Sequence, residues 1–263
     1  MIIIEKKAFA KINLTLEILG KKRGDGFHDM ASVMHKIDLC DTVTVTWDDA
    51  FEGITLNCDA DVCAPEENLA FRAAKAYYDA IGKTANLKID LVKRIPFGAG
   101  LAGGSADAAA VLDAVNEKEK ALSLAELSAI AASLGSDIPF CLEAHTCAMC
   151  TGRGEIVTDL PTPDLSGRVV VKKPTMSLST KGIYAAYDEK YGEDYTKDRT
   201  ERMAQRIRKG AELKEILALM CNDFQPLCEE RCPEIADLVA EMRKQGMLSQ
   251  MSGSGSAVFG IRL

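Results

Sequence analysis

The chain has 263 residues, of which 47% are hydrophobic and 27% are charged, a balance typical of a globular protein with a substantial core. Its formal net charge of −7 gives no support for nucleic acid or a membrane as a partner, because both present negative surfaces. No apolar run approaches the roughly 18 residues of a membrane-spanning helix, and Glu5 stands where a signal peptide would stay apolar. We therefore expect a cytoplasmic protein.

The nine cysteines do not indicate a disulfide framework, because their number is odd and we expect no export. His145, Cys147 and Cys150 come closest to a metal-ligand cluster, but a zinc site normally needs a second ligand pair and none is near. We expect Cys141, Cys147 and Cys150 to lie in strands as small apolar residues.

The apolar residues in the first part of the chain are spaced as in several strands and one helix. Partial alternation of apolar residues predicts strands at 2–7, 9–19, 31–47, 52–58 and 86–93. Pro65 opens a helix that Gly82 ends. Lys11 and Asn13 are two residues apart in the second strand, so they project to the same face. That face is either an ordinary solvated one or part of a site.

The loop at residues 19–30 gathers three cations, three glycines and the pair Phe27-His28. A flexible surface turn accounts for the glycines and the cations but not for the pair. An aromatic face beside an imidazole is suited to stack on a planar base and to hydrogen-bond its edge. The loop therefore predicts a base-binding site.

A glycine-rich loop follows the strand at 86–93, and its glycines are Gly98, Gly100, Gly103 and Gly104. A turn that merely joins a strand to a helix needs fewer of them. Glycine lets backbone N–H groups approach a ligand, and the start of the next helix adds unpaired donors and the positive end of the helix dipole. The helix buries a face formed by Ala108, Val111, Leu112 and Val115. Loop and helix together predict a site for the phosphates of a nucleotide.

Other phosphate-binding motifs fit this loop less well. Gly98-x-Gly100-x-x-Gly103 matches the dinucleotide fingerprint, but residues 94–97 separate it from the strand and the acids that follow lie in or near the helix. Neither the P-loop motif nor the signatures of protein kinases occur.

A second helix begins at the capping box of Ser123 and Glu126 and ends at Gly135. Asp137 follows just beyond, where the helix dipole disfavours a carboxylate. This position indicates a cation partner, a catalytic role or an ordinary turn aspartate.

A loop rich in helix and strand breakers at residues 161–167 is the predicted domain boundary, which gives domains at 1–162 and 163–263. The second domain is expected to hold a strand at 169–171, a helix that carries Ile183, Tyr184 and Tyr187, and helices near 201–221 and 233–245. The chain closes with a second glycine-serine turn that leads into apolar residues 257–261.

Three separated stretches resemble the three motifs of the GHMP kinases, namely Ala10–Leu14, Pro96–Ala110 and Met251–Ala257. They occur in order and at suitable distances, which makes the triple more specific than one glycine loop. Further segments resemble the branch of this family that phosphorylates a cytidine diphosphate-linked methylerythritol, namely 22–28, 134–140, 151–155 and 222–224. The resemblance covers nearly the whole chain.

The resemblance implies an α+β, two-domain GHMP kinase fold, with an N-terminal domain like ribosomal protein S5 domain 2 and a ferredoxin-like C-terminal domain. It implies transfer of the γ-phosphoryl of ATP to the 2-hydroxyl of the small-molecule substrate, with Mg²⁺ as cofactor and the two substrates meeting between the domains. We expect a monomer or weak homodimer.

The resemblance also implies roles for individual residues. Asp137 would accept the hydroxyl proton, and Lys11 would hold Asp137 charged and in place; Ser105 would lie near the metal. The ATP-binding residues would be Pro96, Phe97, Gly98, Ala99, Gly100, Leu101, Ala102, Gly103, Gly104, Ser105 and Ala106. The substrate-binding residues would be Asn13, Phe27, His28, Thr180 and Tyr184. Tyr184 has a second interpretation as a helix core residue.

Two residues depart from the family pattern. Ala102 stands where the family usually has glycine, which implies a looser approach to phosphate. Phe27 replaces a usual tyrosine, which keeps the stacking face but loses a hydroxyl.

Two other functions stay open. One is another small-molecule GHMP kinase, which would lack the Asp25–His28 segment. The other is a non-catalytic nucleotide-binding relative, which would lose Lys11 and Asp137.

Overall fold

The computed structural model describes residues 1–20, 24, 26, 28–61, 63–191 and 197–263. Phe27, Asp25 and the cations at 21–23 lie outside these residues, so of the predicted base-binding loop the structure describes residues 19, 20, 24, 26 and 28–30. Among the described residues, no helix combines the length and the apolar character needed to span a membrane.

The chain forms two compact units, and each gathers segments that are far apart in the sequence. Unit 1 comprises Met1–Ala10, Leu39–Phe97 and Ala102–Ala144, and unit 2 comprises Lys11–Asp38, Gly98–Leu101 and His145–Leu263. This partition differs from the two linear segments 1–162 and 163–263, and that division stays a prediction.

Unit 1 contains a sheet whose strands run in the order β4-β5-β3, with β1 on the free side of β3. The strands are β1 (Ile2–Asn13), β3 (Met30–Trp47), β4 (Ile54–Cys58) and β5 (Leu87–Val92), and β1 and β3 continue into unit 2. The pair β3–β5 is antiparallel from Thr42↔Val92 to Trp47↔Leu87, whereas β4 and β5 are parallel.

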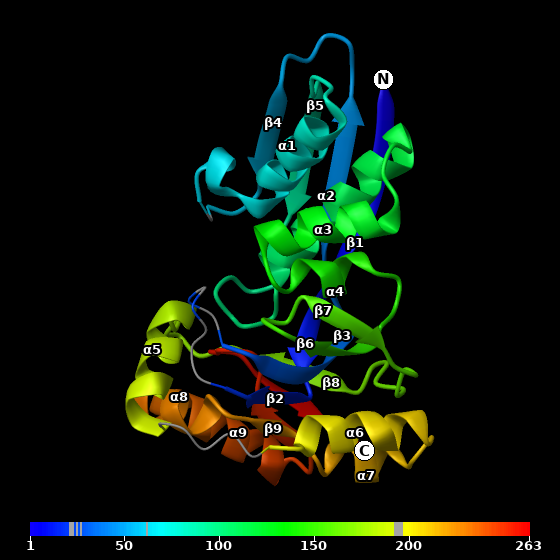
Figure 1. The fold of residues 1–263 in the computed structure, drawn as a ribbon. Helices are drawn as coiled ribbons and strands as arrows, with labels where there is room; N and C mark the ends of the chain where they lie inside the picture. Colours follow the sequence, from blue (N-terminus) through cyan, green and yellow to red (C-terminus); the bar gives the residue numbers. More distant parts are fainter. Residues whose placement is uncertain (21–23, 25, 27, 62, 192–196) are drawn as a thin grey trace. The chain divides into compact units, whose positions relative to one another are not determined.

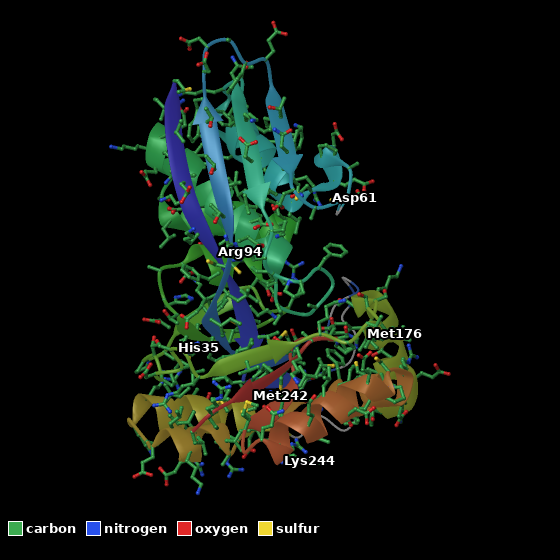
Figure 2. All side chains as sticks on the ribbon, turned by 180° about the vertical axis from the view of Figure 1, so that it is seen from behind. His35, Asp61, Arg94, Met176, Met242 and Lys244 are labelled. Carbon is green, nitrogen blue, oxygen red and sulfur yellow. The ribbon has the colours of Figure 1, made fainter. Side chains whose placement is uncertain are left out.

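Helices cover one face of this sheet, and the opposite face is open, as Figures 1 and 2 show from the two sides. The helices of unit 1 are α1 (Leu69–Ile81), α2 (Gly103–Glu119), α3 (Leu124–Leu134) and α4 (Ile138–Leu142), and a 3-10 turn, η1 (Pro65–Glu67), precedes α1. Alternate strand residues such as Val43, Val45 and Ile89 join the alanine-rich faces of α1 and α2 in one core. The predicted buried face of α2 is confirmed, because Ala108, Val111, Leu112 and Val115 are fully buried.

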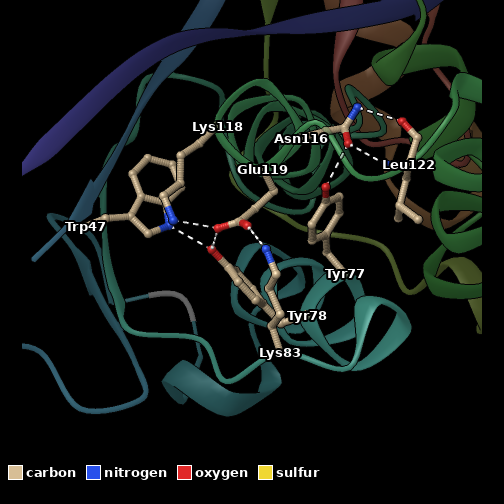
Figure 3. Close-up of polar contacts among 8 residues, drawn as sticks. All are labelled: Trp47, Tyr77, Tyr78, Lys83, Asn116, Lys118, Glu119 and Leu122. Atoms are coloured by element: carbon tan, nitrogen blue, oxygen red, sulfur yellow. Dashed lines mark hydrogen bonds and ion pairs between the residues drawn. The ribbon is translucent and has the colours of Figure 1, made fainter. Parts of the chain in front are cut away.

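A polar cluster joins the end of α2 to α1 at the edge of this core (Figure 3). Glu119 accepts hydrogen bonds from Tyr78 (3.1 Å), Lys83 (2.7 Å) and Lys118 (2.5 Å), and Trp47 Nε1 donates to the Tyr78 hydroxyl at 2.9 Å. Burial alone would raise the pKa of Glu119, but these donors outweigh it and lower the pKa to about 2.

Unit 2 contains the remaining strands. They are β2 (Thr15–Ile18), β6 (Cys147–Thr151), β7 (Ile156–Asp159), β8 (Val169–Lys172), β9 (Cys221–Asn222), β10 (Leu248–Met251) and β11 (Val258–Ile261). β2 lies between β3 and β9, β6 between β3 and β7, and β10-β11-β8 form a separate antiparallel sheet.

Five helices belong to unit 2, among the residues that the structure describes. They are α5 (Thr180–Tyr191), α6 (Arg199–Arg208), α7 (Leu213–Leu217), α8 (Gln225–Arg231) and α9 (Pro233–Lys244). The buried face of α9 includes Met242, which Figure 2 labels, and a Cβ on Gly260 of β11 would lie only 2.9 Å from the Met242 sulfur.

The structure corrects several predicted elements. The single helix expected over 201–221 is two helices, α6 and α7. The chain turns between them at Gly210, whose φ is +65°, and it enters β9 after α7. Asn68 rather than Pro65 caps α1: its side chain accepts a hydrogen bond from the Ala70 N–H. Cys147 and Cys150 lie in β6 as expected, but Cys141 lies in the helix α4 and not in a strand.

Candidate active site

Two glycine turns far apart in the sequence meet within unit 2. The Ser252 hydroxyl donates to the Gly100 carbonyl at 3.1 Å, and the Ala257 N–H donates to the Ala99 carbonyl at 3.1 Å. A Cβ on Gly100 would lie 2.2 Å from the Ser252 carbonyl oxygen, and one on Gly253 would lie 2.9 Å from the Gly100 oxygen. Only glycine permits this backbone approach, and the φ angles of both glycines are positive as well.

Asn222 supports the second turn through two hydrogen bonds and makes a third within its own segment. Its amide nitrogen donates to the carbonyls of Met251 and Gly253, each at 2.9 Å, and its amide oxygen accepts from the Phe224 N–H. The segment 222–224 resembles the family in sequence, and the structure adds a physical reason for it. These contacts fix the shape of the turn at 251–253.

The other part of the first glycine loop belongs to unit 1 and opens α2. Ala102 is the N-cap residue of α2, and its side chain caps no N–H group. Its φ of 59° lies in the left-handed region, where an L-residue with a Cβ is strained by about 1 kcal/mol. Gly103, Gly104, Ser105 and Ala106 form the first turn of the helix, so the predicted junction of glycine loop and helix is confirmed.

The segment before the loop has mixed exposure. Pro96 is half-buried, whereas Phe97 is 68% exposed. The predicted ATP-binding role of these two residues stays a prediction.

Lys11 and Asn13 lie on one face of β1, as their spacing predicts, but that face is buried. Lys11 is 3% exposed and Asn13 is 1% exposed. The Lys11 ammonium donates to Asn13 Oδ1 at 2.8 Å, the Asn13 amide donates to Ser32 Oγ at 2.7 Å, and the Lys11 N–H donates to the Leu101 carbonyl at 3.0 Å. The ordinary solvated strand face is therefore excluded, because a buried lysine requires polar partners.

Asp137 lies at the junction of α3 and α4, half-buried in unit 1. It follows the C-terminus of α3 as predicted, but the sequence interpretation missed that a new helix begins at Ile138. Asp137 is the N-cap residue of α4 and its side chain caps no N–H group of that helix. Lys11 and Asp137 belong to different units, so their pairing stays a prediction.

His28 and Tyr184 are brought together within unit 2. Their ring centroids are 5.4 Å apart at 31°, and Tyr184 packs edge-on against Phe224 with centroids 4.7 Å apart. His28 Nε2 lies 2.6 Å from Asp188 Oδ1. A carboxylate only accepts, so Nε2 carries the proton and, in the neutral ring, Nδ1 is left as an acceptor. The sequence analysis missed Asp188, whose only signal was its place one helical turn after Tyr184.

Thr180 begins α5, and its hydroxyl lies 2.8 Å from the Ser254 hydroxyl of the second glycine turn. A residue expected to bind substrate thus contacts the third family motif within one unit. Either hydroxyl can donate, so the pair can adapt to an acceptor or a donor on a ligand.

Comparisons with known proteins identify the family of this chain. The chain matches the model of the GHMP kinases N terminal domain at residues 68–144 and that of GHMP kinases C terminal at residues 203–261. The chain belongs to the GHMP kinase family. It therefore has the two-domain α+β fold of these kinases, as the three motifs indicated.

Individual relatives are similar over nearly the whole chain. The 4-diphosphocytidyl-2-C-methyl-D-erythritol kinase of Desulfitobacterium hafniense is 40% identical over 98% of this chain and 87% of its own. That of Pelotomaculum thermopropionicum is 41% identical over 98% and 89%. A crystal structure of 4-(cytidine 5'-diphospho)-2C-methyl-D-erythritol kinase matches with a TM-score of 0.79 and 33% identity, over 98% of this chain and 90% of that one.

More distant structures share the fold alone. Homoserine kinase from Cytophaga hutchinsonii matches with a TM-score of 0.73 at 17% identity, over 99% of this chain and 85% of that one.

Proposed function

We propose that this kinase transfers the γ-phosphoryl group of ATP to the 2-hydroxyl of 4-diphosphocytidyl-2-C-methyl-D-erythritol, in the non-mevalonate route to isoprenoid precursors. The observation that carries the proposal is the likeness to kinases of that name at about two-fifths identity over nearly full length. The His28–Tyr184 ring pair supports it, since it offers a planar base a stacking face and a hydrogen-bonding edge in one place.

The ATP phosphates would be bound by backbone N–H groups of Gly98–Ala106. The close packing of Gly100 against Ser252 leaves residues 98–101 little freedom, which favours ordered donors in this part of the loop before a ligand arrives. The N-terminal end of α2 adds the N–H groups of residues 103–105 and the positive end of the helix dipole.

The residues present fit a magnesium ion that is bound mainly by the nucleotide. No group of three His, Cys, Asp or Glu side chains able to hold a metal occurs among the described residues, and Ser105 places one hydroxyl in the first turn of α2. Mg²⁺ commonly takes one or two protein oxygens beside substrate phosphates and water. When bound, it would neutralise developing phosphate charge, with Ser105 as its protein ligand.

Asp137 would accept the proton of the attacking hydroxyl, and Lys11 would stabilise the transferring group and the charge of Asp137. The hydrogen bond from Lys11 to Asn13 supports this role, because it fixes the ammonium without neutralising its charge.

The cytosine would stack beside Tyr184, with Phe27 as the predicted second face. His28 Nδ1 is suited to accept an N–H of the cytosine amino group, because Asp188 keeps the proton on Nε2. Asn13 and Thr180 would hydrogen-bond the polar tail of the substrate. We further expect a cytoplasmic enzyme, a monomer or weak homodimer, without a nucleic-acid or membrane partner.

The test is ADP release from ATP and Mg²⁺ with the diphosphocytidyl substrate, homoserine or mevalonate, beside an Asp137→Asn variant. We expect release that requires the cytidyl compound and falls at least about 100-fold in the variant. Release with homoserine or mevalonate instead would keep the family and exclude the proposed substrate. ATP binding without turnover on any of them would favour a non-catalytic relative.

A further inference from the structure

A buried charge cluster in unit 1 touches both stems of the glycine loop. Lys93 follows the last residue of β5, and its ammonium contacts the carboxylates of Asp41 on β3 and Asp107 on α2. The Lys93 side chain is 11% exposed, and those of Asp41 and Asp107 are 0% and 2% exposed. Burial alone would lower the pKa of Lys93, but the two carboxylates outweigh it and raise the pKa, so the ammonium stays charged.

Asp41 fixes the stem that enters the loop. Its Oδ1 accepts the N–H groups of Arg94 at 2.5 Å and Ile95 at 2.8 Å, and Figure 2 labels Arg94 where the chain leaves β5. The antiparallel register explains the contact. Thr42 lies opposite Val92, so Asp41, the residue before Thr42, lies beside the chain that follows Val92. The side chain of Ile95 in turn packs under α2: a Cβ on Gly103 would lie 3.0 Å from Ile95 Cγ2.

Asp107 fixes the stem that leaves the loop. It lies in the second turn of α2, just after the residues predicted to bind phosphate, and its Oδ2 receives the Lys93 ammonium. Its Oδ1 is buried and has no hydrogen-bond partner among the described residues. Burying a carboxylate with one oxygen unpartnered costs free energy. Stability alone therefore does not explain why charged side chains lie in the core here.

We propose that Lys93, held between Asp41 and Asp107, is a positioning residue that sets the two stems of the glycine loop, residues 94–97 and the first turn of α2, for binding the ATP phosphates. The inference rests on the proposed function of the loop. Apolar residues of similar volume would fill the same space and often stabilise a core equally well, but they would not lock the strand and the helix in one register.

The first test compares Lys93→Met with the double variant Lys93→Met/Asp107→Leu. The single variant leaves buried acids without their cation and is expected to unfold at a lower temperature. The double variant removes Lys93 together with Asp107, while Asp41 keeps its two backbone donors, so we expect its Tm to fall less than that of the single variant. Both are expected to raise the KM for ATP about tenfold or more, with the KM for the cytidyl substrate within about twofold.

Two controls separate positioning from a general loss of stability. Lys6→Met removes ion pairs with Asp113 and Glu117, which are farther along α2 and on its exposed side, and should leave both KM values unchanged. Val115→Ala destabilises the buried face of the same helix and should lower the Tm without raising the KM for ATP. Lys93→Arg keeps the charge and should restore part of the ATP affinity.

Direct titration with ATP and Mg²⁺ by calorimetry distinguishes the two proposals. Weaker ATP binding by the double variant supports the positioning role whatever the second substrate is. Wild-type ATP affinity in that variant, or an equal loss in Val115→Ala, would overturn the positioning role while the kinase activity stands. Normal ATP binding by the wild type with no turnover of the cytidyl compound would overturn the proposed substrate alone.

Discussion

The Ser252 hydroxyl donates to the Gly100 carbonyl at 3.1 Å, and a Cβ on Gly100 would lie 2.2 Å from the Ser252 carbonyl oxygen. These residues are 152 positions apart in the chain. Their contact shows that residues 98–101 of the second family motif form one backbone structure with the third motif within unit 2. Glycine at position 100 serves the packing of one turn on another as much as the approach of a ligand.

Gly100→Ala should therefore be severely destabilising. The added methyl would meet a backbone oxygen, and φ is +73° at this position, so strain and overpacking together should cost about 2–5 kcal/mol. Chemical denaturation measures the loss. Gly210→Ala is the matched control, because its φ is +65° but nothing lies within 4 Å of the new Cβ; it should cost about 1 kcal/mol. Equal losses in the two variants would show that the turns do not pack as described.

Ala102→Gly should stabilise the protein. The left-handed φ of 59° strains alanine, and glycine adopts it freely, although glycine also makes the unfolded chain more flexible. We expect a net gain of up to about 1 kcal/mol and a lower KM for ATP, since the loop gains a closer approach to phosphate. Lys120→Gly at the other end of α2, with φ 52°, should give a similar gain without a change in KM. A lower Tm for Ala102→Gly would contradict the backbone conformation.

Asp188→Asn should weaken binding of the cytidyl substrate and leave the KM for ATP unchanged. The variant removes the carboxylate that keeps the His28 proton on Nε2, so Nδ1 is no longer reserved as an acceptor. We expect the KM for the cytidyl compound to rise about tenfold, as for the loss of one charge-assisted hydrogen bond. Asp198→Asn, on the same unit and paired with Arg202, is the control and should behave like the wild type. Unchanged KM values in Asp188→Asn would remove His28 from the proposed site.

Glu119→Gln should destabilise the protein near pH 7 and much less at low pH. The pKa of Glu119 is about 2 in the folded protein and about 4.5 for an ordinary glutamate, so its stabilisation is full above pH 4.5 and is lost as the pH falls through 2. Since two of its partners are lysines near the surface, we expect about 1–2 kcal/mol rather than the full value of the shift.

The control for this variant is Asp79→Asn, which removes an exposed pair with Lys75 on α1. It should cost no more than about 0.5 kcal/mol at pH 7. Urea denaturation of both variants from pH 7 to pH 2.5 measures the difference. A Glu119→Gln loss that stays constant with pH would show that the lysines do not hold the carboxylate.

The elements with strong local signals were predictable from the sequence. Ser123 and Glu126 form both hydrogen bonds of the predicted capping box. Gly82 ends α1 in the left-handed conformation. The alternation at 86–93 correctly predicted β5. The short helices α4 and α8 were missed, because each begins at a proline-containing turn and is too short to show a helical period.

The site was predictable only as far as its motifs. The family resemblance points to Lys11, Asn13 and the glycine turns as candidate site residues, but the contacts that hold this region depend on residues with no local signal. Asp188 orients His28 across 160 positions of sequence, and Asn222 holds a turn 29 to 31 positions away. The tertiary fold brings such partners together, and the neighbouring sequence carries no sign of them. Only the structure therefore reveals them.

The most direct test of the central claim is phosphorus NMR of the reaction product formed from ATP, Mg²⁺ and 4-diphosphocytidyl-2-C-methyl-D-erythritol. We predict one new phosphomonoester resonance on the 2-hydroxyl, with the cytidine diphosphate resonances retained and with ADP formed in equal amount. Inorganic phosphate with an unchanged cytidyl compound, or a phosphomonoester that forms only on homoserine or mevalonate, would contradict it.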